Sequence, residues 1–151
     1  MRMISDLGQF VRAAVSSGEP GRQTEALQAV MHAQRQLFQE PLETILQLSL
    51  DQQIDHLARG ETPAGAAERI RAYAEILDQA AQVYEHGDKV SLAQSSRQLA
   101  LSALLTAVIR WPEQREMLAP TIQRIREQTA AEHYQPPLQE LIEHYNDTQV
   151  A

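Results

Sequence analysis

Apolar and small residues recur every three to four positions along most of this chain, the spacing of one face of an α-helix. The pattern is longest on either side of residues 85–88 and predicts two long helices folded back as an antiparallel hairpin over 63–110. Its marker positions are Ala66, Ala67, Ile70, Tyr73, Ala74, Leu77, Ala80, Ala81 and Tyr84, then Ala93, Ala100, Leu101, Leu104 and Val108. Since no segment alternates with a period of two, we expect an all-α fold without a β-sheet.

Capping and turn residues set the bounds of the remaining predicted helices. Ser49 and Thr62 occupy helix-start positions, Gly60 and Gly87 occupy helix-end positions, and Asp88 is expected to cap the second helix of the hairpin. The predicted helices cover about 6–17, about 23–38, a short segment opened by Pro41, 49–60, 63–87, 88–110, Pro120 to about Glu132, and Pro136 to about Asn146.

The second helix of the hairpin carries no charge from Leu99 to Ile109, and its apolar residues cover more than one face. A helix that is apolar nearly all round is buried on several sides. We therefore expect it to be the central element of the bundle. An alternative is that one of its faces is reserved for a second copy of the chain or for a partner.

Composition narrows the class of protein. With 151 residues, the chain is expected to form a single all-helical domain over 1–151, with the hairpin as its core and C-terminal helices over 120–147. It has no cysteine, which excludes disulfides, thiolate catalysis and cysteine zinc sites. Its net charge is −7 and its basic residues are scattered rather than clustered, which argues against nucleic-acid binding. No segment resembles a signal peptide or a membrane span, and the first helix has too few cations to bind anionic lipid. We expect a cytoplasmic protein that does not bind membranes.

Small residues repeat between the first two predicted helices and the long hairpin. In each pair, two alanines lie seven positions apart on the second helix: Ala26 and Ala33 in the first pair, Ala93 and Ala100 in the other. Ala26 and Ala93 are 67 residues apart, close to two periods of 34. This spacing indicates a duplicated helical hairpin.

Tyr84, Gly87 and Asp88 lie near the turn of the long hairpin, and with these alanines the chain resembles the tetratricopeptide repeat. More specifically, Leu48–Arg126 resembles a small bacterial family of tetratricopeptide-like helical proteins of unassigned function, which implies no catalytic or binding residues. The signature tryptophan is missing near Leu77, and the two long helices exceed the length of standard repeat helices. We therefore expect tetratricopeptide-like hairpins packed as a compact bundle or short superhelix.

Three residues are candidates for binding. Arg97 shares a helical face with small and apolar residues, where an unpaired charge is costly. It either forms an internal ion pair or faces a groove between helices, where its two-pronged guanidinium holds a carboxylate of a peptide. Arg69 and Tyr73, one turn apart on the preceding helix, form a second candidate pair.

Motifs for catalysis and metal binding are weak in this sequence. None of the five histidines forms a His-x-x-x-His pair. Glu140 and His144, with Glu143 adjacent, offer two or three possible ligands, but on an exposed terminal helix we expect them to form a solvated face. Neither Ser95 nor Ser96 has a base nearby in the sequence. We expect no catalytic residues, no metal and no cofactor.

The leading hypothesis is a non-enzymatic helical scaffold or adaptor that binds a protein or peptide through a groove between hairpins, or that self-associates as a homodimer. It predicts an exposed apolar patch, or a groove lined by Arg97, Arg69 and Tyr73. The alternative is a small-ligand-binding protein or an enzyme with a cavity between the long helices, which predicts an enclosed pocket with convergent polar groups.

Overall fold

The computed structural model describes residues 2–131 and 134–149, and this part of the chain contains eight α-helices and no strand. The helices are α1 (Arg2–Ser17), α2 (Pro20–Phe38), α3 (Leu42–Leu46), α4 (Leu50–Ala58), α5 (Pro63–His86), α6 (Val90–Arg110), α7 (Arg115–Glu127) and α8 (Pro136–Gln149). A 3-10 turn, η1 (Pro112–Gln114), precedes α7. The all-α prediction is confirmed.

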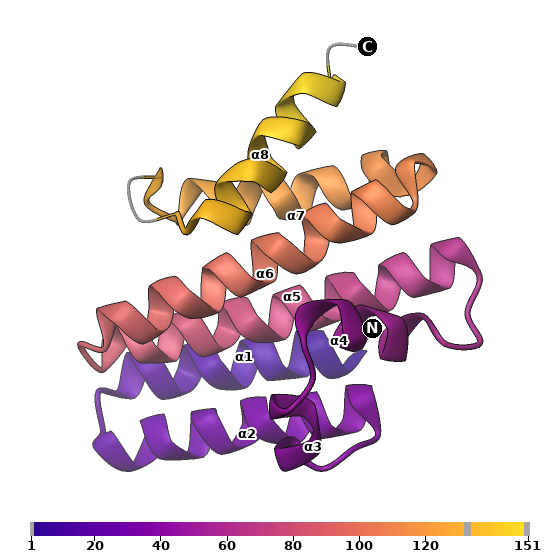
Figure 1. Ribbon diagram of the computed structural model, residues 1–151. Helices are drawn as coiled ribbons and strands as arrows, with labels where there is room; N and C mark the ends of the chain where they lie inside the picture. The colour runs from indigo at the N-terminus through magenta and orange to yellow at the C-terminus, as the bar shows by residue number, and fades with distance from the viewer. Residues whose placement is uncertain (1, 132–133, 150–151) are drawn as a thin grey trace.

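Helices α5 and α6 form the predicted antiparallel hairpin (Figure 1). Gly87 ends α5, and the backbone N–H groups of Asp88 and Lys89 donate to the carbonyls of Glu85 (3.1 Å) and Tyr84 (2.8 Å). Asp88 has a left-handed backbone (φ 61°), as the residue after a helix C-cap often does. The prediction that Asp88 caps α6 is therefore wrong. It closes α5 instead, and Lys89 is the N-cap of α6.

Local capping signals correctly predicted the bounds of α4 and the start of α5. The Ser49 hydroxyl accepts from the Gln52 N–H (3.2 Å), and the Gln52 side chain accepts from the Ser49 N–H (2.8 Å). The Thr62 hydroxyl accepts from the Gly65 N–H (3.1 Å) at the start of α5. Gly60 follows α4 with φ 75°, a backbone conformation that glycine adopts without strain.

Helix α7 differs most from its predicted bounds. It begins at Arg115, five residues before Pro120, and continues through the proline. Pro120 removes only the hydrogen bond to the carbonyl of Glu116, and because Glu116 is exposed, water can solvate that carbonyl. The helix ends at Glu127, and its predicted end at Glu132 lies outside the described residues.

Three other bounds shift by a few residues. Helix α1 begins at Arg2 instead of residue 6, α2 begins at Pro20 instead of residue 23, and α8 ends at Gln149 instead of residue 146. Proline is favoured in the first turn of a helix because the N–H groups there have no partner within the helix. The predicted gap between the first two helices, residues 18–22, is therefore only Gly18 and Glu19.

The centre of the bundle is α5 rather than α6. It contacts α1, α2, α4, α6 and α7, and its buried residues surround the helix except along the strip of Glu68, Arg71, Glu75 and Gln82. In Figure 1, α1 and α2 lie on one side of α5, α6 lies on the other, and α7 and α8 follow beyond α6. The expectation that α6 is the central element is therefore wrong, although nine of its 21 residues are buried.

The buried apolar side chains of these helices join into one hydrophobic cluster. None of the helices that the structure describes combines the length and the apolar character that a membrane crossing requires.

Candidate functional site

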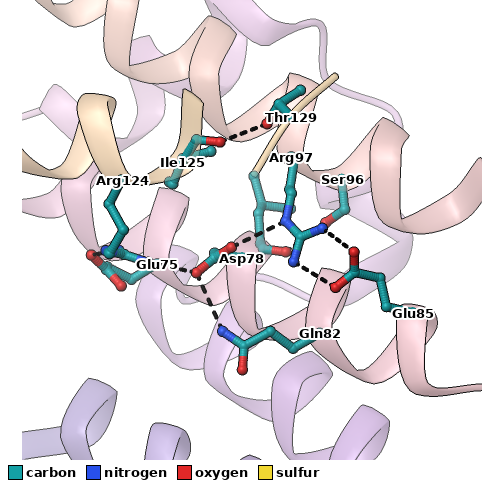
Figure 2. A network of polar contacts seen from close by, with 10 residues as sticks. Glu75, Asp78, Gln82, Glu85, Ser96, Arg97, Arg124, Ile125 and Thr129 are labelled. Carbon is teal, nitrogen blue, oxygen red and sulfur yellow. Dashed lines mark hydrogen bonds and ion pairs between the residues drawn. The ribbon is translucent and has the colours of Figure 1, made fainter. Parts of the chain in front are cut away.

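Arg97 lies inside the bundle, with 2% of its surface exposed. Its Nη1 and Nη2 atoms donate to the two carboxylate oxygens of Glu85 at 2.6 and 2.9 Å, and Nε donates to Asp78 at 3.4 Å (Figure 2). All three nitrogen atoms of the Arg97 guanidinium therefore donate to carboxylates on α5. Of the two roles considered for Arg97, the structure shows the internal ion pair.

Asp78 is the fully buried centre of this network. Its Oδ2 atom accepts from Arg124 Nη1 on α7 at 2.7 Å and from Gln82 Nε2 at 3.4 Å. Arg124 also pairs with Glu75 through Nη2. A buried carboxylate needs such partners because its desolvation is costly. The network ties α5, α6 and α7 together, as Figure 2 shows.

Arg97 and Glu85 each stabilise the charged form of the other. The hydrogen bond from Arg97 holds the pKa of the Glu85 carboxyl below its ordinary value, although partial burial acts in the opposite direction. The same bond raises the pKa of Arg97 above its already high value. Both groups are therefore charged at neutral pH.

Arg69 and Tyr73 lie near the other end of α5. Arg69 Nη2 donates to the carbonyl of Leu37 at 2.7 Å and Nη1 lies 3.6 Å from a carboxylate oxygen of Glu61. The buried Tyr73 hydroxyl donates to Gln53 Oε1 at 2.9 Å, and burial raises the pKa of Tyr73 to about 12, with the bond to Gln53 acting in the opposite direction. Both side chains connect α5 to neighbouring helices.

The structure brings Arg69 and Tyr73 close together and keeps Arg97 apart. Arg97 is bound to residues 78 and 85, nine and sixteen positions along α5 from residue 69, which corresponds to about 13 Å and about 24 Å along a helix axis. The polar groups of all three side chains have partners within the chain. A binding role for these residues stays a prediction, and we base the candidate site on other residues.

An apolar groove lies between the two hairpins, and none of these three residues lines it. Its walls are α2 and α3 on one side and α6 on the other, its floor is α5, and its volume is about 450 Å³. The lining residues are Leu27, Val30, Met31, Gln34, Leu42, Leu46, Leu77, Ala80, Tyr84, Leu92, Ser95, Ser96 and Leu99. None of them is charged.

Two leucines at the groove are unusually accessible. Leu46 on α3 is 74% exposed and Leu92 on α6 is 49% exposed. Single exposed apolar residues are ordinary, but these two belong to one concave apolar surface, which is typical of an interaction site. The groove is the candidate functional site.

The sequence offered only an indirect signal for this groove: the uncharged stretch from Leu99 to Ile109, one face of which we considered reserved for a partner, overlaps the groove at Leu99 alone. From Val90 to Ile109 the only charge on α6 is Arg97, which points inward, so the outer face carries none. The opposite wall gave no such signal, because α2 and α3 look like ordinary amphipathic helices until their positions relative to α6 are known.

Other candidate chemistry does not converge in the described residues. Within 2–131 and 134–149 there is no group of three or more His, Asp or Glu side chains that could hold a metal ion. His144, which we had weighed with Glu140 as a pair of ligands, lines a small cleft of about 280 Å³ between α6, η1 and α8. The arrangement at the groove favours apolar binding rather than acid–base chemistry.

The chain matches no protein-family model, no curated protein and no solved structure.

Proposed function

We propose that this chain is a non-enzymatic helical scaffold of the tetratricopeptide-like kind, which binds a segment of a partner protein in the groove between its hairpins. One observation carries the proposal: an open, uncharged groove with a volume of about 450 Å³ lies between α2, α3 and α6. Covering apolar surface is the main source of binding free energy in most protein complexes.

The arrangement of the helices supports the tetratricopeptide-like part of this proposal. Helices α1 and α2 contact each other, α5 and α6 contact each other, and α2 also packs on α5. Two hairpins, separated in the sequence by α3 and α4, therefore lie side by side with a groove between their second helices, α2 and α6. Recognition by such a surface follows the mode in which an apolar face enters a hydrophobic groove.

Photo-crosslinking in the cells that naturally contain this protein tests the proposal. Leu92 and Ile109 are each replaced by a photoreactive phenylalanine analogue. The two positions lie on the same helix with similar exposure, 49% and 44%; Leu92 lines the groove, and Ile109 lines the separate small cleft between α6 and α8. We expect a crosslinked partner from position 92 but not from position 109.

The partner found in this way is then purified and bound to the unmodified protein and to a Leu92→Glu variant. We expect direct binding to the unmodified protein and at least about tenfold weaker binding to the variant. The proposal is wrong if no protein is crosslinked from position 92, or if the purified partner binds both forms equally.

A small apolar ligand is the second candidate occupant, because the volume of the groove lies within the range of small-molecule sites. The groove is open rather than enclosed, and no charged side chain lines it. These two features favour a protein partner over a small ligand. Thermal-shift measurements with apolar metabolites and fatty acids distinguish the two. A rise in Tm that Leu92→Glu abolishes would favour the small ligand.

A further inference from the structure

The polar groups in the groove are few and come from only four side chains. They belong to Gln34, Tyr84, Ser95 and Ser96, and the Ser96 hydroxyl already donates to the carbonyl of Leu77 at 2.7 Å. An extended peptide buried here would leave backbone N–H and C=O groups without partners, which is costly. A helix satisfies these groups internally.

From this lining we infer that the occupant is an amphipathic helix whose contact face is uncharged and about two turns long. The inference rests on the proposed function and specifies the conformation, length and charge of the bound segment.

The dimensions of the groove give the length. Each of its three long helices contributes residues over a span of seven positions: Leu27–Gln34 on α2, Leu77–Tyr84 on α5 and Leu92–Leu99 on α6. Seven positions rise about 10.5 Å, or two helical turns. A bound helix would therefore present apolar residues at positions i, i+3, i+4 and i+7.

Small side chains lie in the middle of the floor and of the α6 wall, whereas the larger Val30 and Met31 lie in the middle of the opposite α2 wall. Ala80 is in the middle of the floor, with Leu77 and Tyr84 on either side, and Ser95 and Ser96 are in the middle of the α6 wall. Because small residues let a neighbouring side chain approach closely, the middle of the floor and of the α6 wall suits a bulky side chain. We expect a leucine, methionine or aromatic residue at i+3 or i+4.

Helix α8 shows how this fold binds such a helix. It packs on α6 through Leu138, Leu141, Ile142 and Tyr145, which are at positions i, i+3, i+4 and i+7. Its contact face is uncharged, and its charged residues Glu140, Glu143 and Asp147 are all exposed. The same hairpin therefore already holds one helix of the type that we propose for the groove.

Charge restricts the occupant further. An acidic or basic residue on its contact face would lose water in the groove without gaining a partner, because no charged side chain lines the walls. The net charge of −7 on the whole chain attracts a basic segment and repels an acidic one at long range. We expect basic residues, if any, on the outer face of the bound helix.

Selection from a phage-displayed library of random peptides of about 14–16 residues, long enough for four helical turns, tests the inference on the full-length protein. We expect enriched peptides with apolar residues at i, i+3, i+4 and i+7, few acidic residues and no internal proline. Circular dichroism difference spectra of the best peptide should show helix formation on binding.

Leu92→Glu and Ile109→Glu are the matched variants, since they place the same charge on one helix inside and outside the groove. We expect Leu92→Glu to weaken peptide binding about tenfold or more and Ile109→Glu to leave it unchanged.

The outcomes separate the two proposals. Peptides that lose binding with Leu92→Glu but bind in an extended form, or through acidic contacts, would overturn the helix and leave the scaffold function standing. Peptides that are indifferent to Leu92→Glu, or a failure to enrich any, would overturn both. Light scattering that shows a dimer, which Leu92→Glu converts to a monomer, would replace the partner helix with a second copy of this chain.

Discussion

Leu77 and Asp78 are neighbours on α5, and they belong to two contrasting regions of the molecule. Asp78 is fully buried in a network of charged side chains between α5, α6 and α7. Leu77 lies in the floor of an open groove without any charge. Each region reverses the usual distribution of residues, in which charges are exposed and apolar surface is buried.

The two reversals have different consequences for the protein. Buried charges are stable only with their partners, so the network holds three helices in one fixed arrangement. An open apolar surface gains free energy when something covers it. Substitutions in the network should therefore reduce the free energy of unfolding, and substitutions in the groove should reduce binding.

The largest expected effect on the free energy of unfolding is that of Asp78→Ala. It leaves Arg97 and Arg124 without their shared carboxylate and should lower the free energy of unfolding by about 3 kcal/mol, measured by urea titration. The control is Asp55→Ala, because Asp55 forms an exposed pair with Arg110 and should change the value by less than about 1 kcal/mol. Equal losses of unfolding free energy in the two variants would mean that the buried network stabilises the fold no more than an exposed ion pair does.

Arg97→Lys sharpens this test, because it keeps the positive charge and removes the planar guanidinium group with its several donors. Lysine cannot donate at once to both oxygens of Glu85 and to Asp78, so we expect a loss of about 1–2 kcal/mol in the same assay. Arg71→Lys, at an exposed pair with Glu68, should have almost no effect. A neutral Arg97→Lys would show that charge alone suffices in the network.

A smaller effect should appear in the pH dependence of stability. Because Arg97 lowers the pKa of Glu85 in the folded chain, the ion pair stabilises the protein above the unfolded-state pKa of Glu85, ordinarily about 4.5. This stabilisation is lost as the pH falls through the lower, folded-state value. Between about pH 7 and about pH 3, Glu85→Gln should therefore lose less unfolding free energy than the unmodified protein. Identical losses would contradict the coupling between Glu85 and Arg97.

The smallest expected effect on stability is that of Leu92→Glu. Leu92 is half exposed, so the substitution should change the free energy of unfolding by no more than about 0.5 kcal/mol. Ile109→Glu should behave in the same way. A large loss for Leu92→Glu alone would show that the groove wall contributes to the fold itself.

Features of the fold that depend on adjacent residues could be predicted from the sequence. Ser49 and Thr62 cap helices because their partners lie three positions away. The predicted roles of Asp88 and Pro120 were wrong because each residue type suits more than one position relative to a helix. An aspartate can cap a helix or adopt the left-handed conformation after one, and a proline is tolerated inside a helix where the carbonyl it leaves free is exposed.

The candidate site could be predicted only in part. The sequence singled out Arg97 as a charge on an apolar face, but its partner Asp78 and the bridging Arg124 become neighbours only when α5, α6 and α7 pack. The groove depends on the placement of α2 and α3 opposite α6, which no local pattern specifies. Leu46 and Leu92, at the two sides of the groove, were therefore missed.

The most direct test of the account is to titrate the helical peptide obtained by selection into the unmodified protein, Leu92→Glu and Ile109→Glu, and to measure unfolding free energies of the same samples. We expect binding to weaken about tenfold or more in Leu92→Glu alone, with all three stabilities within about 0.5 kcal/mol. Unchanged binding to Leu92→Glu, or a binding loss that follows a loss of stability, would contradict the assignment of the groove as the binding surface.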